Sequence, residues 1–332
     1  MKTGMNNVAA ERPEKEKKPY LHLFLLSITA VVWGASFVSQ SVGMDHVGPF
    51  TYNGVRMLMG GTVLLPVIPL LRKFGITKRV DMDDVLAVKG VDSVEDLPWY
   101  DRKPQFFGGL FAGIVLFFAS SFQQYAIQFT TTGKAGFITS LYVVLVPVFG
   151  IFLGHKIKKS DWAGVSLALV GLYLLSIKGG FYISHGDFFL ILCAIFYAIH
   201  IIVLDHYSPM VDGVVLSSTQ FFIVGLISLV PMFAMENPAW GALIAAGPPL
   251  LYSGILSSGV GFTLQTIGLQ KVPPTQASLI TSQESTLSVV FGWLLLGETM
   301  TGRELIGCAM MLTGVLISQL APEKKSKSQS LT

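Results

Sequence analysis

Two charged side chains lie inside apolar stretches of the sequence, where a charge is costly to bury. Glu284 lies within SLITSQESTLSVVFGWLLLGE, residues 278–298, and Arg56 within the apolar stretch 49–71. A buried carboxyl group needs a cavity or a partner, and a guanidinium, which keeps its proton, needs water, a carbonyl or an anion. Glu284 is therefore a candidate for binding a proton or a substrate amine, and Arg56 for binding a substrate carboxylate. Alternatively, each holds neighbouring helices together, and a direct pair between them would make both structural.

Other polar and aromatic side chains fall where they could line a cavity beside these charges. Trp33, Ser36 and Gln40 are spaced i, i+3 and i+7, which puts them on one face of a helix. The remaining candidates for substrate contact are Gln123, Tyr142, Tyr197, His200, Gln265 and Gln283. Polar side chains in a bilayer bond to a neighbouring helix or to a ligand. Packing between helices is therefore the alternative for each of them, and His200 could be a hydrogen-bonded core residue.

The elements that must position these side chains are membrane-spanning helices. Hydrophobic residues make up 52% of the 332-residue chain and charged residues 13%, whereas about a quarter of a soluble protein is charged. A helix needs about 20 apolar residues to cross the hydrocarbon core. Ten segments meet this need: 21–42, 49–71, 105–127, 132–153, 161–178, 187–204, 213–235, 247–269, 275–297 and 302–320. The sequence therefore predicts an all-α polytopic membrane protein with ten transmembrane helices.

The distribution of Lys and Arg predicts how these helices are oriented. Of the 23 basic residues, 19 flank the helices on the side of the N-terminus and three flank them on the opposite side. Because basic loops stay in the cytosol, both termini are expected there, with the protein in the cytoplasmic membrane. The tails 1–19 and 321–332 are expected to be disordered, and the charged segment 72–104 is expected to be a cytosolic insert with a short helix.

The chain also resembles itself. The stretch ITSLYVVLVPVFG recurs in the second half of the chain as ITSQESTLSVVFG, and aligning the two pairs Tyr142 with Glu284, the fifth residue of each. Near the front of each half, a slightly larger offset pairs Trp33 with Tyr197. These matches predict a repeat in which each copy contributes residues to one site.

The two copies are predicted to be five-helix domains, 20–178 and 187–320. Because five is odd, the second copy must cross the membrane in the opposite sense to the first. Inverted repeats of this kind build secondary transporters, with the substrate site between the halves. We therefore expect a central, water-filled chamber into which the carboxyl group of Glu284 projects.

The sequence also resembles the drug/metabolite transporter superfamily, EamA type. AVVWGASFVSQSVGMDHVGPFTYNGVRMLMGG, residues 30–61, is similar to that family's first two spans, through Trp33-Gly34 and Arg56. GWLLLGE followed by TGRELIGCAMMLTGVLI is similar to its ninth and tenth spans. The resemblance covers roughly residues 20–320. It implies ten helices in two repeats and a carrier that usually exports metabolites or amino acids.

Three features depart from that family's pattern. The family's first repeat often ends in Gly-Glu, where this chain has Gly154-His155. Its ninth span often carries Glu-Pro, where this chain has Glu284-Ser285, so a kink supplied by proline is not expected there. The insert 72–104 is longer than the family's usual connection.

The function predicted from the sequence is secondary-active transport rather than catalysis. The chain would move a small metabolite such as an amino acid by alternating access, outward according to the resemblance, with protons as the candidate coupling ion. The sequence holds no nucleotide-binding loop, zinc-protease motif or hydrolase elbow, and no cofactor, metal or nucleic acid is expected. The expected partners are a small-molecule substrate and the lipid bilayer, with a homodimer as a candidate assembly. A membrane ligand sensor, with the insert as its output element, is the alternative.

Overall fold

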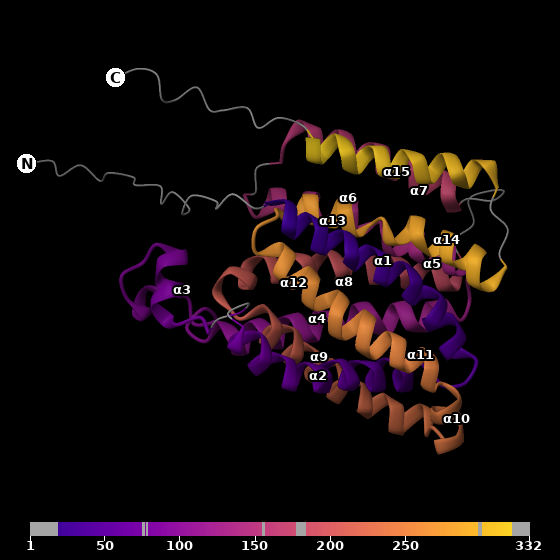
Figure 1. Cartoon of the computed structure of the whole chain (residues 1–332), viewed down its shortest axis with the longest axis horizontal. Coiled ribbons are helices and arrows are strands. Elements are labelled where there is room, and N and C mark those ends of the chain that lie inside the picture. The colour runs from indigo at the N-terminus through magenta and orange to yellow at the C-terminus, as the bar shows by residue number, and fades with distance from the viewer. Residues whose placement is uncertain are drawn as a thin grey trace, which may run out of the picture.

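The computed structural model consists of helices packed side by side (Figure 1). It describes residues 19–74, 77, 79–154, 157–176, 184–297 and 301–320. Except for Pro19, the tails 1–19 and 321–332 lie outside these described residues. Across the described ranges every regular element is helical, as the composition predicts.

The described elements of the first half are α1 Pro19–Met44, α2 Pro49–Lys73, α3 Met82–Lys89, the 3-10 helix η1 Val94–Asp96, α4 Pro104–Ile127, α5 Thr132–Thr139, α6 Tyr142–Phe152 and α7 Lys159–Ser176. Both α2 and α4 carry a proline in the first turn. Proline is favoured there because the backbone N–H that it lacks would have no partner within the helix.

The described elements of the second half are α8 His185–Tyr207, the 3-10 helix η2 Ser208–Met210, α9 Gly213–Pro231, the π-helix η3 Met232–Glu236, α10 Trp240–Ala245, α11 Gly247–Leu251, the π-helix η4 Tyr252–Phe262, α12 Thr263–Leu269, α13 Pro274–Thr281, α14 Glu284–Leu296 and α15 Gly302–Leu320. The π-helix η4 is rich in glycine and serine. π-helical turns are rare and are frequent at functional sites.

Seven helical segments among the described residues are long and apolar enough to cross a membrane: Tyr20–Met44, Pro49–Lys73, Pro104–Ile127, Thr132–Phe152, His185–Met210, Gly213–Glu236 and Pro274–Leu296. The other three predicted spans, 161–178, 247–269 and 302–320, are helical over their described residues but do not meet that standard. The segment 247–269 is divided among α11, η4 and α12, while α7 and α15 each begin with charged residues.

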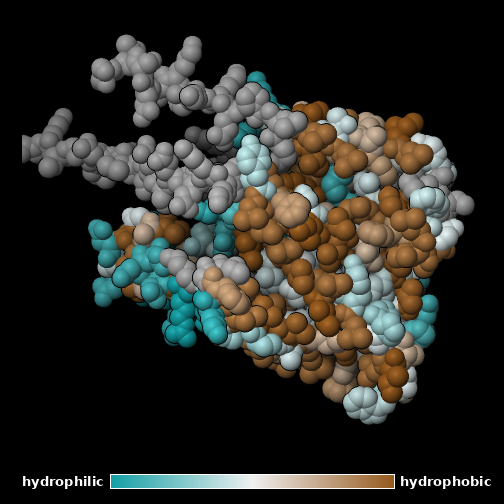
Figure 2. Space-filling view, viewed as in Figure 1, coloured by the Kyte–Doolittle hydropathy of each residue, from teal (hydrophilic) through white to brown (hydrophobic). Residues whose placement is uncertain are grey.

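The insert lies at one end of the bundle, where α1 begins and α15 ends (Figure 1). Apolar side chains cover much of the visible face of the bundle, and hydrophilic ones gather over the insert (Figure 2). Exposed apolar side chains include Phe24 on α1, Leu226 on α9 and Leu295 on α14. A surface of this kind is suited to lipid along the bundle and to water around the insert.

A buried carboxylate in the insert links it to the bundle. Asp101 Oδ2 lies 2.7 Å from Lys89 Nζ at the end of α3, and its Oδ1 lies 2.9 Å from His206 Nε2 near the end of α8. The short helix expected in the insert is α3, which begins with a capping box between Asp81 and Asp84. A capping box satisfies backbone N–H groups that the first turn leaves without partners.

Two helical segments are interrupted at positions that the internal repeat pairs. α5 ends at Thr139 and α6 begins at Tyr142, whereas α13 ends at Thr281 and α14 begins at Glu284. Each interruption places the first residue of the following helix inside the bundle, where both side chains are buried. The offset read from the sequence therefore also relates the two interruptions in the structure.

The second interruption forms without proline. Thr281 Oγ1 donates to Ala277 O at 3.0 Å, and Ser282 Oγ donates to Leu279 O at 2.8 Å. Hydroxyls that bond to carbonyls of the preceding turn compete with backbone N–H groups and bend helices. Serine and threonine thus interrupt this span, although it lacks the Glu-Pro pair of the related family.

α7 and α15 pack against each other through glycines. A Cβ atom on Gly164 would lie 2.6 Å from Gly314 O, and one on Gly171 would lie 2.6 Å from Gly307 O. Contacts that move up one helix as they move down the other mean that the two helices run antiparallel, as Figure 1 shows. Ser318 Oγ adds a 2.6 Å hydrogen bond to Asp161 Oδ1.

We expect Gly164→Ala to destabilise the protein. The added methyl group would meet a backbone carbonyl that cannot rotate away, so the free energy of unfolding should fall by about 1–3 kcal/mol. The measurement is thermal or denaturant unfolding of the purified protein in detergent, followed by circular dichroism. Gly241→Ala on α10 is the matched control: nothing lies within 4 Å of that position, so the change should be neutral or stabilise by up to about 1 kcal/mol. Equal effects at both positions would contradict the close packing.

Candidate functional site

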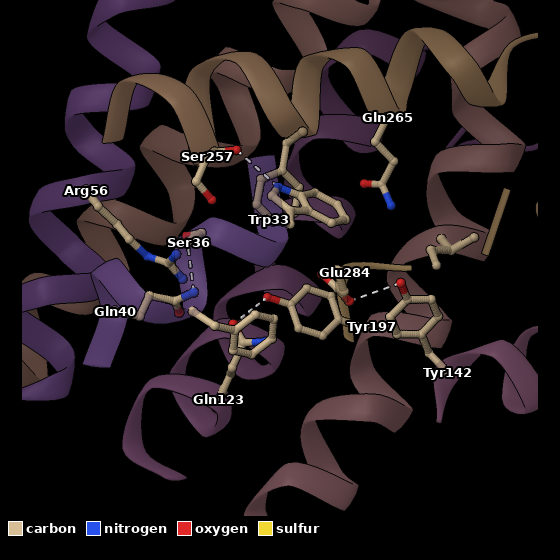
Figure 3. A pocket seen from close by; sticks show the side chains of 13 residues that line it. Trp33, Ser36, Gln40, Arg56, Gln123, Tyr142, Tyr197, Ser257, Gln265 and Glu284 are labelled. Atoms are coloured by element: carbon tan, nitrogen blue, oxygen red, sulfur yellow. Dashed lines mark hydrogen bonds between the residues drawn. The ribbon is translucent and has the colours of Figure 1, made fainter. Parts of the chain in front are cut away.

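A small cavity lies where seven α-helices and the π-helix η4 meet inside the bundle, and the side chains that line it are buried or nearly so (Figure 3). Its lining comprises Trp33, Ser36, Phe37 and Gln40 from α1, Arg56 from α2, Gln123 from α4, Tyr142 from α6, Tyr197 and Ile201 from α8, Ser257 and Phe262 from η4, Gln265 from α12 and Glu284 from α14. Nine of the eleven residues singled out from the sequence are in this lining, and His200 and Gln283 are not.

The cavity is much smaller than the water-filled chamber expected from the sequence. The space open to the centre of a water molecule is about 20 Å³, and one buried water needs about 10–15 Å³ by the same measure. Aromatic side chains fill much of the space between the lining helices. The rings of Trp33 and Phe262, for example, are centred 4.6 Å apart. The cavity of this structure is therefore too small to hold a metabolite such as an amino acid.

Glu284 belongs to a chain of hydrogen bonds. It is the first residue of α14 and is 4% exposed. Tyr142 Oη lies 3.1 Å from Glu284 Oε1 and 3.0 Å from Thr281 Oγ1, which donates to Ala277 O. An ionised carboxylate can accept a hydrogen bond from the Tyr142 hydroxyl. A protonated carboxyl can instead donate to Tyr142, which then donates to Thr281, so the chain satisfies both forms.

Arg56 carries the other buried charge and is 2% exposed. Its Nε and Nη2 donate to Asn53 Oδ1 at 3.3 and 3.2 Å, and its guanidinium carbon lies 6.0 Å from the centre of the Tyr52 ring. Among the ion pairs within 4.0 Å that the described residues form, none joins Arg56 to Glu284. The two side chains reach the cavity from opposite sides (Figure 3), so the direct pair considered as an alternative is not formed here.

Trp33 is fixed by the π-helix that it faces. Its Nε1 donates to Ser257 O at 3.2 Å, and Thr29 Oγ1, one turn earlier on α1, donates to Gly261 O at 3.1 Å. A Cβ atom on Gly261 would lie 2.6 Å from Trp33 Nε1. Glycine at this position therefore makes room for the indole ring.

Three amides complete the lining. Gln123 Nε2 donates to Thr139 Oγ1 at 3.3 Å, and its Oε1 accepts from Tyr197 Oη at 3.3 Å. By contrast, Gln40 Oε1 and Gln265 Oε1 are buried without a hydrogen-bond partner. A buried acceptor without a donor calls for a water molecule or a ligand. The cavity thus combines one cation, one carboxyl group and two open acceptors.

His200 and Gln283 lie outside the lining. His200 Nε2 is 2.8 Å from Gln220 Oε1 on α9, and the His200 ring meets the Phe262 ring edge-on at 6.0 Å. It lies behind the cavity wall with Nε2 hydrogen-bonded, whereas its Nδ1 is buried without a hydrogen-bond partner. Gln283 stands at the break before α14, and its side-chain amide is buried without a partner.

Four lining residues were missed in the sequence: Phe37, Ile201, Ser257 and Phe262. A signal for two of them was present, because Phe37 and Ile201 lie one helical turn after Trp33 and Tyr197, which the repeat pairs. Positions i and i+4 share a helix face. Ser257 accepts the hydrogen bond of Trp33 through its backbone carbonyl, for which side-chain chemistry gives no signal. Within the described ranges, no group of three or more His, Cys, Asp or Glu residues could hold a metal ion.

Comparison with known proteins decides the family. The model of the EamA-like transporter family matches the chain twice, over residues 21–177 and 184–320. The chain belongs to the EamA-like transporter family. The resemblance inferred from Trp33-Gly34, Arg56 and the last two predicted spans is thereby confirmed.

Several relatives of this EamA-like transporter are themselves named transporters. An "Uncharacterized transporter" of Archaeoglobus fulgidus is 28% identical over 296 residues, which cover 89% of this chain and 84% of the relative. "Uncharacterized transporter YoaV" of Bacillus subtilis is 24% identical over 306 residues, which cover 89% and 95%. A protein of known crystal structure is 20% identical with a TM-score of 0.64, over 90% of this chain and 96% of that one, and this likeness concerns the fold alone.

Membership of the EamA-like transporter family settles the broad class of the protein. It is a multi-pass membrane protein, and its partners are the lipid bilayer and a small-molecule substrate. The names of the relatives indicate transport rather than catalysis. The buried cavity between the helices gathers polar side chains from both halves of the chain.

Proposed function

We propose that this EamA-like transporter is a secondary-active carrier for a small zwitterionic metabolite, such as an amino acid, that works by alternating access with protons as the coupling ion. One observation carries the proposal: a guanidinium and a carboxyl group share one buried cavity without pairing with each other. Two buried charges without a mutual partner are costly. A ligand with complementary charges would offset that cost. Export rather than import rests on the family resemblance.

The lining matches the parts of an amino acid. Arg56 would receive the carboxylate, because its planar fork of donors suits two oxygens. Glu284 would receive the ammonium group, together with the open acceptors Gln40 Oε1 and Gln265 Oε1. Trp33 and the other aromatic side chains would enclose an apolar side chain.

Proton coupling would follow from competition at Glu284. Either a proton or the substrate ammonium group neutralises the Glu284 carboxylate. Binding of one therefore requires release of the other. The hydrogen-bond chain through Tyr142 and Thr281 accommodates the carboxyl group in both protonation states. A proton entering while a zwitterion leaves carries one net positive charge inward in each cycle.

We further propose that ten helices span the cytoplasmic membrane as an inverted repeat, with both termini in the cytosol. Two polar contacts, one at each end of α2 and α9, support this arrangement. Arg72 Nη2 pairs with Asp212 Oδ2 at 2.9 Å, and Glu236 accepts the backbone N–H of Thr51 at 2.7 Å beside Gly48. The sequence offset that pairs Trp33 with Tyr197 also pairs Arg72 with Glu236 and Gly48 with Asp212. Equivalent positions therefore meet at both ends, as a two-fold relation between the halves requires.

Exchange across a proteoliposome membrane tests the function. Vesicles that contain the purified protein are loaded with unlabelled amino acids and are then given the same amino acids with a radioactive label. Saturable exchange of at least one amino acid, accelerated by substrate on the far side, is the expected result. If none of the twenty common amino acids exchanges faster than in protein-free vesicles, the proposed substrate class is wrong.

A further inference from the structure

We propose that Asn53 is a positioning residue for Arg56. It would hold the guanidinium toward the cavity while leaving its charge unpaired, so that Arg56 remains free to receive an anionic group. That last step rests on the proposed function of the cavity. The positioning itself rests only on the contacts around Asn53, and the two can fail separately.

Asn53 and Arg56 are one helical turn apart on α2. Asn53 is fully buried, and its Oδ1 accepts hydrogen bonds from Arg56 Nε at 3.3 Å and from Nη2 at 3.2 Å. A guanidinium has five N–H donors in a rigid plane. Fixing two of them on one oxygen atom orients the plane of the group.

The opposite side of the amide is held by two other helices. Asn53 Nδ2 lies 3.3 Å from Ser121 Oγ on α4 and 3.5 Å from Ser228 Oγ on α9. Ser228 Oγ already donates its proton to Val224 O at 2.7 Å, so toward Asn53 it can only accept. The NH₂ group must therefore face α9, and the carbonyl oxygen must face Arg56.

The neutrality of asparagine is what makes this position consequential. An aspartate at position 53 has the same shape and could accept the same two hydrogen bonds, but it would cancel the charge of Arg56. Alanine would remove the acceptor and, with it, both hydrogen bonds that fix the plane of the guanidinium. Asparagine orients the cation without neutralising it.

A cycle of thermal unfolding measurements on the full chain in detergent tests the contact. Asn53→Asp is made alone and together with Arg56→Gln. A carboxylate beside the buried guanidinium gains a partner, whereas beside glutamine it is an unpaired buried charge. We expect the change in Tm caused by Asn53→Asp to be more favourable by about 4 °C or more when Arg56 is present. Equal changes in both backgrounds would overturn the positioning role.

Ligand-induced shifts in Tm test the consequence for anion binding. The probes are 4-methylpentanoate, which has a carboxylate and no amine, and leucinol, which has an amine and no carboxylate. In the Asn53→Asp variant, the apparent Kd of 4-methylpentanoate should rise at least about tenfold, while that of leucinol should not rise. If Asn53 had only a structural role, the substitution would weaken the binding of both probes to the same extent.

The matched control is Asn237→Asp, the same chemical change at an exposed position after η3. It should leave the binding of both probes unchanged. If 4-methylpentanoate does not raise the Tm of the unsubstituted protein, the anion-binding step is wrong. If the cycle shows coupling but no amino acid exchanges, the positioning role stands and the proposed function fails.

Discussion

Replacing Glu284 with glutamine is expected to abolish substrate accumulation driven by a pH gradient. Glutamine keeps the shape and the bond to Tyr142 but cannot take up and release a proton. Exchange of substrate for substrate should continue, because the amide oxygen can still accept from an ammonium group. The affinity of the variant for its substrate should be lower by about tenfold, the loss expected for one charge-assisted hydrogen bond. The measurement is labelled amino acid uptake into proteoliposomes, with and without an imposed pH gradient.

The control for this prediction is Glu95→Gln in the insert, where the side chain is exposed. It makes the same chemical change far from the cavity and should leave accumulation intact. Unchanged gradient-driven uptake by the Glu284→Gln variant would remove Glu284 from the coupling step. Loss of both accumulation and exchange would make the residue structural instead.

Replacing Arg56 with glutamine is expected to remove recognition of carboxylates. Among the residues that line the cavity, Arg56 carries the positive charge. Charged hydrogen bonds to a carboxylate are about twice as strong as neutral ones. Leucine exchange should fall by about a hundredfold or more, the effect of losing two such bonds. Arg56→Lys should recover only part of the activity, since an ammonium group has no bidentate fork.

The readout for Arg56 is competition against labelled leucine exchange in proteoliposomes. Leucinol and 4-methylpentanoate are tested as weak inhibitors of this exchange. Against the residual exchange of the Arg56→Gln variant, leucinol should inhibit as potently as it does with the unsubstituted protein, and 4-methylpentanoate should no longer inhibit. Arg79→Gln, an exposed arginine in the insert, is the matched control and should behave as the unsubstituted protein does. Equal loss of potency for leucinol and 4-methylpentanoate would mean that Arg56 supports the fold rather than the carboxylate.

Much of the site follows from local properties of the sequence. A charge in an apolar stretch is conspicuous whatever the fold, so Glu284 and Arg56 could be singled out before the structure. Helical spacing places Trp33 and Gln40 on one face, and both line the cavity. The internal repeat pairs Tyr142 with Glu284, and in the structure these two side chains lie within hydrogen-bonding distance.

Other features depend on packing that a single helix does not reveal. The rotation of α8 turns Ile201 toward the cavity and His200 toward Gln220, although both lie near Tyr197 in the sequence. The volume of the cavity is set by how far the aromatic rings of different helices interpenetrate. Asn53 was not singled out from the sequence, because its partners come from α4 and α9.

The measurement that tests the central claim most directly is the accessibility of the cavity from each side of the membrane. In a background with Cys193→Ala and Cys308→Ala, Ser36→Cys places a reactive thiol in the lining, and Ser217→Cys places one at a buried position outside it. Both variants are treated with a membrane-impermeant thiol reagent in right-side-out and inside-out vesicles. Alternating access predicts that the thiol at position 36 reacts from both sides and that the thiol at position 217 reacts from neither. Labelling of position 36 from one side alone, or from neither side, would contradict the account.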